Sequence, residues 1–380
     1  MFIILIFSLS FLIYIFFGYP VILWILSFLF GKKVNKKEIY PYVSLIISAY
    51  NEENVMRQKI ENSLELDYPK EKLEIIVASE STDKTNEIVK EYKDKGVTLY
   101  AYEKREGKRA TLYRTVPLAK GEIIVFSDAN AIYKKDAVKK IVRNFSDKRI
   151  GCVSGRLRYI NQKRSIIGEG ETTYWEYDFI LKKMASRLFS LAGCGGVNGS
   201  IFAIRKELYN PIDRHRGDDF EISCRIEIGG YGVILETEAV SCEESSEDSK
   251  QEFRRKVRLA TWNFKSTVML LTEALQRGRI LTAFLLFSHR FLRYTTPVWL
   301  ILLFVNSAFL FDNGNIRYFF YLQLVFYFLA VSGFIMEKAD HKANAIFLIP
   351  FYFCMVNGAA FLGLTKNLFG KSELLWEKSR

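Results

Sequence analysis

The stretch Gly121-Glu122-Ile123-Ile124-Val125-Phe126-Ser127-Asp128-Ala129-Asn130 is the part of the chain from which the fold can be worked out. Its apolar run, Ile123 to Phe126, predicts a short buried strand that ends abruptly at Ser127. In α/β proteins the carboxyl ends of the strands open into a crevice where ligands bind. A carboxylate at that place can hold a hard cation. Taken alone, the stretch fits a metal site and an ordinary turn made by Asp128 and Asn130 equally well.

Strand and helix patterns alternate on both sides of this stretch. Repeated strand–helix units imply a mostly parallel sheet with helices on both faces, which is a Rossmann-like α/β fold. The predicted strands are 43–48, 74–78, 97–102, 122–126 and 201–205, and the predicted helices are 52–66, 83–92, 108–119 and 165–191.

The apolar residues gather at the two ends of the chain. They make up 49% of it, with 31 Phe and 21 Tyr, and the ends are long enough to span a bilayer. We expect an N-terminal transmembrane helix over residues 1–31. A signal peptide is disfavoured because no basic region precedes the run and no small-residue cleavage site precedes Gly31. The lysines that follow, from Lys32 to Lys37, favour the cytoplasmic side.

The C-terminal part predicts further membrane segments. We expect interfacial amphipathic helices over 263–294, transmembrane helices over 295–365 and a basic tail over 366–380. Three apolar segments would place the tail outside, whereas its Lys and Arg residues favour the inside. Either one segment is re-entrant or the short first one does not cross. The protein is thus expected in the cell membrane, multi-pass, with a cytoplasmic catalytic domain over 40–262.

Net charge and cysteine content narrow the partners. A net charge of +12 suits anionic lipid or a nucleotide diphosphate. With membrane segments present, we expect membrane lipids as partners and no nucleic acid. The five Cys form no CxxC pair and only three His are present, so we expect neither a zinc site nor a disulfide framework. The pattern does not predict an oligomeric state.

Four polar clusters lie in the middle of the chain: 48–53, 79–83, 128–130 and 218–221. The first three follow predicted strands, so they should converge on one rim of the sheet. A glycine-rich segment over 193–200 precedes another strand. It fits neither a dinucleotide fingerprint nor a P-loop. It is either a plain turn or a loop whose backbone approaches a ligand closely.

The order of these motifs resembles glycosyltransferase family 2, which has the GT-A fold. The motifs are Ser-Ala-Tyr-Asn-Glu, Ser-Thr-Asp-x-Thr, Gly-Lys, Phe-Ser-Asp-Ala-Asn, Gly-Asp-Asp-Phe and Gln-x-x-Arg-Arg, and they extend from about Val43 to Trp262. The membrane-bound members of the family, the hyaluronan, cellulose and chitin synthases, are the most similar. Their flanking membrane helices also match the predicted segments.

The resemblance implies a role for each matching residue. Asp219 would be the catalytic base, and Asp128 with Asn130 would bind Mg²⁺ or Mn²⁺ on the diphosphate. Gly195, Gly196 and Asp218 would contact the acceptor. Donor binding would fall to Tyr50, Glu52, Glu80, Lys108, Asp128, Gln251, Arg254 and Arg255.

Three positions depart from the family pattern. Where the family has Asp-Gly-Ser-Thr-Asp, this chain has Ser79-Glu80-Ser81-Thr82-Asp83. Either Glu80 or Ser79 then takes the place of the base-reading acid. Asn130 replaces the last acid of Asp-x-Asp, so this ligand carries no charge. Arg255 stands where processive members have Trp, which weakens a processive interpretation.

These observations predict an inverting glycosyltransferase. It would move a sugar from a nucleotide-sugar donor to a lipid-linked or polysaccharide acceptor at the cytoplasmic face of the membrane. A cation on Asp128, with Lys108 and Arg254, would stabilise the departing diphosphate. Asp219 would deprotonate the attacking hydroxyl. The alternatives are a processive synthase that extrudes its product and an inactive nucleotide-binding scaffold subunit.

Overall fold

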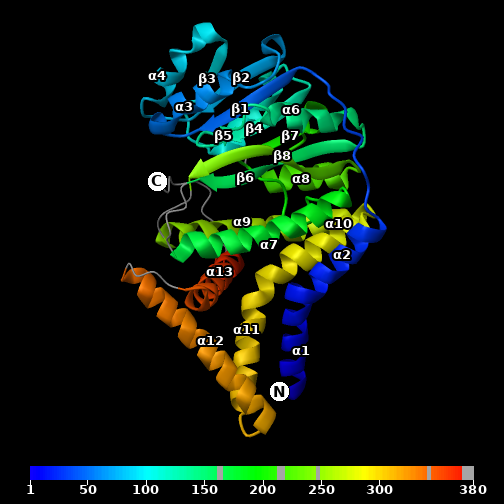
Figure 1. Cartoon of the computed structure of the whole chain (residues 1–380), viewed down its shortest axis with the longest axis vertical. Helices are drawn as coiled ribbons and strands as arrows, with labels where there is room; N and C mark the ends of the chain where they lie inside the picture. Colours follow the sequence, from blue (N-terminus) through cyan, green and yellow to red (C-terminus); the bar gives the residue numbers. More distant parts are fainter. Residues whose placement is uncertain (161–165, 212–218, 245–248, 340–343, 370–380) are drawn as a thin grey trace.

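The computed structural model describes residues 1–160, 166–211, 219–244, 249–339 and 344–369. Its centre is one eight-stranded sheet (Figure 1). Half of that sheet is parallel and consists of β3, β2, β1 and β4, in that order. These strands are β1 (Val43–Ala49), β2 (Leu73–Ser79), β3 (Val97–Ala101) and β4 (Ile123–Asp128). The predicted mostly parallel α/β sheet is therefore confirmed.

The other half of the sheet is mixed. Beyond β4 the order continues β7-β6-β8-β5. β7 is antiparallel to both β4 and β6, while β6 and β8 are parallel to each other. The strands are β7 (Ile201–Arg205), β6 (Ile150–Ile160), β8 (Gly232–Glu244) and β5 (Ile132–Tyr133). Of these only β7 was predicted from the sequence.

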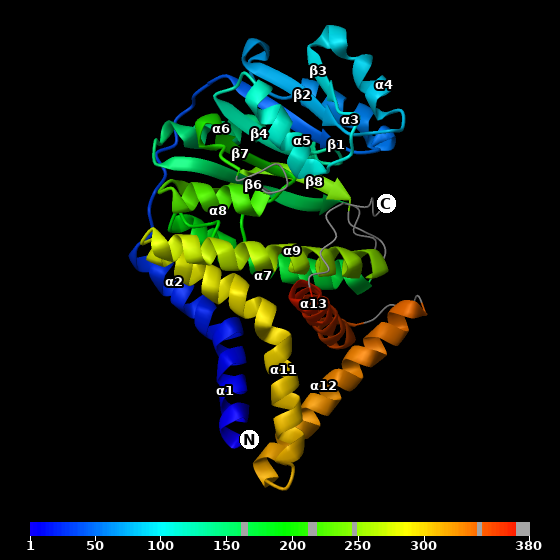
Figure 2. The same cartoon turned by 180° about the vertical axis from the view of Figure 1, so that it is seen from behind.

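Helices cover both faces of the sheet (Figures 1 and 2). One face carries α3 (Glu53–Leu64), α4 (Thr85–Lys90) and α6 (Ala137–Val142). The other carries α5 (Lys108–Thr115) and α8 (Asp219–Ile228). Single 3₁₀ turns join these elements at Lys70–Lys72, Lys93–Lys95, Val116–Leu118, Arg143–Ser146 and Lys206–Leu208.

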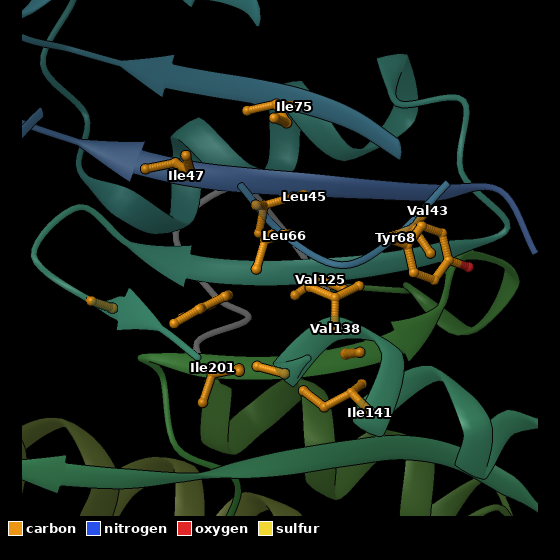
Figure 3. Packing of buried hydrophobic residues seen from close by; sticks show 14 of the residues in the cluster. Val43, Leu45, Ile47, Leu66, Tyr68, Ile75, Val125, Val138, Ile141 and Ile201 are labelled. Carbon is orange, nitrogen blue, oxygen red and sulfur yellow. The ribbon is translucent and has the colours of Figure 1, made fainter. Parts of the chain in front are cut away.

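Successive residues of the parallel strands enter two different cores, because side chains alternate across a sheet. In β1, Leu45 and Ile47 pack on the α3 side (Figure 3), whereas Ile46 packs on the α5 side. All three are 0% exposed. Because both faces of these strands are buried, β1 and β4 consist mainly of consecutive apolar residues.

Long helices connect the sheet to the apolar part of the molecule. α7 (Ile166–Arg187) and α9 (Ser249–Gln276) lie between the sheet and the apolar helices (Figure 1). A continuous helix follows, made of α10 (Ile280–Leu285), a π-helical segment η7 (Leu286–Phe291) and α11 (Leu292–Phe309). The domain boundary predicted at residue 262 thus lies inside α9.

Among the described residues, three helices are long and apolar enough to cross a membrane. Their presence indicates that the protein associates with a membrane. The first runs from Phe2 to Leu29 and consists of α1 (Phe2–Ile13), a π-helical segment η1 (Tyr14–Gly18) and α2 (Tyr19–Leu29). The others are α12 (Gly314–Lys338) and α13 (Ala345–Leu368).

The shorter α11 runs beside α1. The Trp299 ring contacts those of Phe7 and Phe11, with ring centres 5.4 and 4.4 Å apart. Both helices extend away from the sheet, α12 returns toward it, and α13 lies against α7 and α9 (Figures 1 and 2).

Candidate active site

The carboxyl ends of β1, β2 and β4 form one rim. Ser48 of β1 is level with Asp128 of β4, and Ala49 is level with Ser79 of β2. The convergence of the first three polar clusters, predicted from the sequence, is therefore confirmed. It follows from parallel pairing, which brings the carboxyl ends of neighbouring strands to the same edge.

The first two clusters interlock through hydrogen bonds. The backbone N–H of Asn51 donates to the Ser81 hydroxyl at 2.9 Å, and the Asn51 side chain accepts from the Thr82 N–H at 2.8 Å. The N–H of Glu52 donates to the Thr85 hydroxyl at 2.8 Å. Asn51 has φ +55°, a conformation that Asn tolerates better than most residues. Tyr50 and Glu52 are thus held at a stiff corner of the rim.

Tyr50 lies under a cation. The Arg105 guanidinium is 4.0 Å from the centre of the Tyr50 ring. Arg105 belongs to the loop between β3 and α5, so this stacking joins that loop to the end of β1. An aromatic ring beside a guanidinium offers an apolar face and a positive charge together.

Glu80 is only 5% exposed and its carboxylate bonds to the chain itself. One oxygen accepts from the backbone N–H groups of Glu106 and Gly107 at 3.0 and 2.7 Å. The other pairs with Arg114 at 2.5 Å. These bonds support a role in holding the loop that begins α5. Base recognition by Glu80 stays a prediction. Ser79, the other candidate, bonds to Ser81 at 2.9 Å.

Lys108 and Asp128 meet at the centre of the rim. The Lys108 ammonium group forms an ion pair and hydrogen bond with the Asp128 carboxylate. Burial acts to lower the pKa of Lys108, but the carboxylates of Asp128 and Asp219 outweigh it and hold the pKa above its usual value. Lys108 therefore stays charged beside two acids.

Asp219 begins α8 and faces the same place. A Cβ atom built on Gly199 would lie 2.7 Å from Asp219 Oδ2 and 3.8 Å from Lys108 Nζ. Any side chain at position 199 would thus push against Asp219. The glycine lets the backbone lie close to both charged groups. Asp128, Lys108 and Asp219 are far apart in sequence, and the fold brings them together here.

The glycine-rich segment follows α7 and precedes β7. Gly195 and Gly196 have φ +98° and +79°, which favours glycine at both positions. A Cβ on Gly196 would also come within 3.0 Å of the Phe220 ring. The loop is thus fitted closely against the start of α8. Acceptor contact by Gly195 and Gly196 stays a prediction.

A buried lysine that the sequence did not reveal holds the turn after Asp128. Lys59 of α3 is 0% exposed and donates to the carbonyl of Ala131 at 2.5 Å. Its ammonium also lies 3.8 Å from the centre of the Tyr133 ring. Burial lowers the pKa of Lys59 to about 7, although the carboxylates of Asp128 and Glu243 act in the opposite direction. Lysines are rarely fully buried, so nothing in the helical pattern of residues marked Lys59 as a buried residue.

The basic residues of α9 divide into two kinds. Arg254 is exposed. Arg255 forms a bidentate pair with the fully buried Glu252 at 2.7 and 2.9 Å. This pair supports a structural role for Arg255 in α9. The side chain of Gln251 and the whole of Asp218 lie outside the described residues, so their predicted roles stay predictions.

Trp262 of α9 contacts the helix that begins at the rim, α5. The Arg109 guanidinium lies 4.8 Å from its ring centre, and Arg109 directly follows Lys108. α9 is therefore connected to the helix that carries Lys108. In the sequence analysis Trp262 marked only the approximate end of the region that resembles the family.

The residues at the end of β4 fit a divalent cation. Asp128 is partly exposed at the strand end and Asn130 lies two residues later in the turn, so this segment contains a carboxylate and an amide oxygen as candidate ligands. Such hard oxygen donors suit Mg²⁺ and Mn²⁺. The positively charged Lys108 ammonium group already pairs with the Asp128 carboxylate. The site therefore brings together a lysine, oxygen donors suited to a hard cation and a separate carboxylate, a set of groups that fits group transfer with an anionic leaving group.

Comparison with known proteins identifies the class more closely. The sequence pattern of glycosyl transferase family 2 matches residues 44–210. The whole chain is also similar in fold to a mannosyltransferase from Pyrobaculum calidifontis, solved with GDP-Man and Mn²⁺. That likeness has a TM-score of 0.69 and 20% identity, and it covers 97% of this chain and 99% of that one. The domain is thus a GT-A glycosyltransferase fold. Residues 44–210 of the chain thus match glycosyl transferase family 2, and the protein is a glycosyltransferase.

Three curated relatives add detail. A probable glycosyltransferase of Bacillus subtilis, YdaM, is 28% identical over 91% of this chain and 88% of its own length. The beta-monoglucosyldiacylglycerol synthase of a Nostoc species is 27% identical over 51% of this chain, which spans 42% of that synthase. The poly-beta-1,6-N-acetyl-D-glucosamine synthase of Staphylococcus epidermidis is 24% identical over 77% of this chain and 71% of its own length.

Proposed function

We propose that the protein transfers a sugar, with inversion at the anomeric carbon, from a nucleotide-sugar donor to a lipid-linked or polysaccharide acceptor at the cytoplasmic face of the membrane. The observation that carries this proposal is the meeting of Asp128, Lys108 and Asp219 beside Gly199. It supplies a cation ligand, a positive charge and a base within one site.

Each residue has a distinct part in the transfer. The Asp219 carboxylate accepts the proton of the acceptor hydroxyl as that oxygen attacks the anomeric carbon. A single displacement of this kind inverts the configuration. Lys108 holds the diphosphate that leaves, and Arg254 adds a second positive charge from α9. Asp128 and Asn130 would hold a divalent cation, which neutralises charge on the diphosphate. Tyr50 and Arg105 offer a stacking surface at the base end of the rim.

The arrangement of the apolar helices supports a topology. α1 and α11 lie side by side, α12 returns toward the sheet, and α13 stays against α7 and α9 (Figure 2). A topology in which α1, α11 and α12 cross and α13 lies at the interface would put the end of α13 on the cytoplasmic side, which the basic residues that follow favour.

The test uses purified protein in detergent with a panel of nucleotide-sugars and Mn²⁺. We expect one or a few donors to release nucleoside diphosphate, with release strongly reduced in Asp219→Asn and Asp128→Ala. Asp94→Asn serves as the matched control, because Asp94 is exposed on the turn before β3, at the opposite end of the parallel strands from the rim. Wild-type release in both site variants would refute the assignment. The length of the glycan product then separates a single transfer from processive synthesis.

A further inference from the structure

A cavity of about 480 Å³ lies among the apolar helices, between α11, α12 and α13. Its volume falls within the range of roughly 300–1,000 Å³ that is usual for ligand-binding cavities. The walls include Pro297 and Ile301 of α11, Ala330 and Val331 of α12, and Gly358 and Phe361 of α13. The amide of Asn357, a polar residue in the wall, donates to the carbonyl of Phe353 within its own helix at 2.9 Å. Such a lining selects hydrocarbon, because polar groups would lose hydrogen bonds inside it.

The cavity can be reached from the hydrocarbon layer of a bilayer. Two neighbouring residues of its α12 wall differ in exposure, since Ala330 is 6% exposed and Val331 is 56% exposed. The wall therefore continues onto the outer surface of α12, a helix that is apolar enough to cross the membrane. A ligand that enters here comes from the membrane and needs no path through water.

The same cavity adjoins the helix that leads to the active site. α13 packs directly on α9, since a Cβ built on Gly363 would lie 2.6 Å from the Cβ of Ala260. The Asn367 side chain donates to the carbonyl of Thr261 at 2.5 Å. The next residue, Trp262, contacts Arg109 beside Lys108. One helix, α9, therefore touches the donor rim and the helix that forms the cavity wall.

We propose that this cavity binds the hydrocarbon chain of a lipid acceptor. The acceptor's hydroxyl or phosphate head then lies toward α9 and the rim, while its chain fills the space between α11, α12 and α13. This inference rests on the proposed function and narrows the acceptor from lipid or polysaccharide to a lipid. Ordinary bilayer phospholipid is the competing occupant. It would leave sugar transfer independent of the cavity's shape.

The experiment plugs the cavity and measures two products separately. Ala330→Trp fills it from α12, and Ile301→Trp fills it from α11. Val325→Trp is the matched control, because Val325 lies on α12, is 56% exposed and does not line the cavity. Each variant is reconstituted in vesicles made from a total membrane lipid extract, which supplies the acceptors. A donor with a radiolabelled sugar is added. Label in the chloroform phase reports transfer to lipid. A separate sample of each variant is kept in detergent without the lipid extract, and there the release of nucleoside diphosphate reports the donor site.

Both plugging variants should lose about ten-fold or more of the chloroform-soluble label, with donor hydrolysis close to wild type. Val325→Trp should match the wild type in both measurements. Equal lipid labelling in all variants would overturn the inference and leave bilayer lipid as the occupant. Label found only in water-soluble polymer would also overturn it, with the proposed function intact. No nucleotide release by the wild type with any donor would refute the proposed function, and with it this inference.

Discussion

The Arg290 guanidinium lies 4.0 Å from the centre of the Phe220 ring, and Phe220 directly follows Asp219. The same guanidinium donates to the carbonyl of Gly195 and, at 3.1 Å, to the hydroxyl of Tyr294. Arg290 belongs to the π-helical segment η7, and such segments are frequent at functional sites. A helix that continues into α11 thus contacts both the glycine-rich loop and the start of α8.

Replacing Arg290 should therefore impair turnover more than donor affinity. Arg290→Gln removes the planar cation from Phe220, and we expect kcat to fall roughly ten- to hundred-fold with little change in the donor KM. Arg290→Lys should recover part of this loss, because an ammonium keeps the charge but not the planar stacking. Arg277→Gln, at an exposed arginine of the same region, is the control. Steady-state kinetics at several donor concentrations measure both constants, and an unchanged kcat in Arg290→Gln would contradict the prediction.

Asn130 should set the strength of metal binding. It offers a neutral oxygen beside Asp128, so Asn130→Asp adds a second negative charge to the donor set. We expect tighter Mn²⁺ binding in this variant, measured by calorimetric titration in the presence of nucleoside diphosphate. Asn144→Asp does not serve as a control, because Asn144 is buried with its amide bonded to the backbone and to Glu236. Asn62 is unsuitable as a control for a similar reason, because its amide donates to the backbone carbonyl of Tyr133. The control is Asp128→Ala, which should abolish binding. Equal Mn²⁺ affinities of the wild type and Asn130→Asp would contradict this prediction.

Glu80 should act through the loop before Lys108. Its carboxylate binds Arg114 and the N–H groups of Glu106 and Gly107. Glu80→Ala removes this partner from the partly buried Arg114 and leaves the two N–H groups without their acceptor, so we expect the donor KM to rise and the free energy of unfolding to fall by about 1–3 kcal/mol. Arg114→Met should have a similar effect, and the double variant should cost less than the sum. If Glu80 reads the base instead, Glu80→Gln will change the preference among uridine, guanosine and other donors. A uniform decrease supports the structural role.

Glu227 gives the fold a measurable pH dependence. It is 6% exposed in α8 and accepts hydrogen bonds from the Ser190 hydroxyl and from the N–H of Ala192, at the base of the glycine-rich loop. Burial raises the pKa of Glu227 to about 7, although these hydrogen bonds act to lower it. Because the folded pKa exceeds the unfolded one, the native state binds more protons between the two values. The stability that this group contributes is present at low pH and is lost as the pH rises through about 7.

Thermal unfolding of wild type and Glu227→Gln in detergent tests this. Relative to the Gln variant, the wild type should lose up to roughly 3 kcal/mol between about pH 5 and pH 8. Both proteins are measured over the same pH series, so the contributions of other titrating groups cancel in the difference between them. Melting temperatures that stay parallel across the series would show that Glu227 does not titrate in this range.

The local pattern of the sequence was enough to predict the parallel half of the sheet. β1, β2, β3, β4 and their helices are continuous apolar runs and amphipathic segments, and each reports its own environment through neighbouring residues. β6 and β8 were missed because they belong to the mixed half, where partners come from distant segments. β6 ends in alternating charged residues, such as Arg156 and Arg158, that resemble an exposed loop.

The sequence by itself determined which residue types are available to the site. Acids and amides follow the parallel strands, and parallel pairing forces strand ends to one edge, so Asp128 and its neighbours had to share a rim. Only the tertiary structure decided their partners: Lys108 on Asp128, Arg114 on Glu80, Lys59 beneath the turn and Gly199 against Asp219. Those contacts join residues far apart in the chain. Their geometry depends on how helices pack on the sheet, which no local pattern of residues encodes.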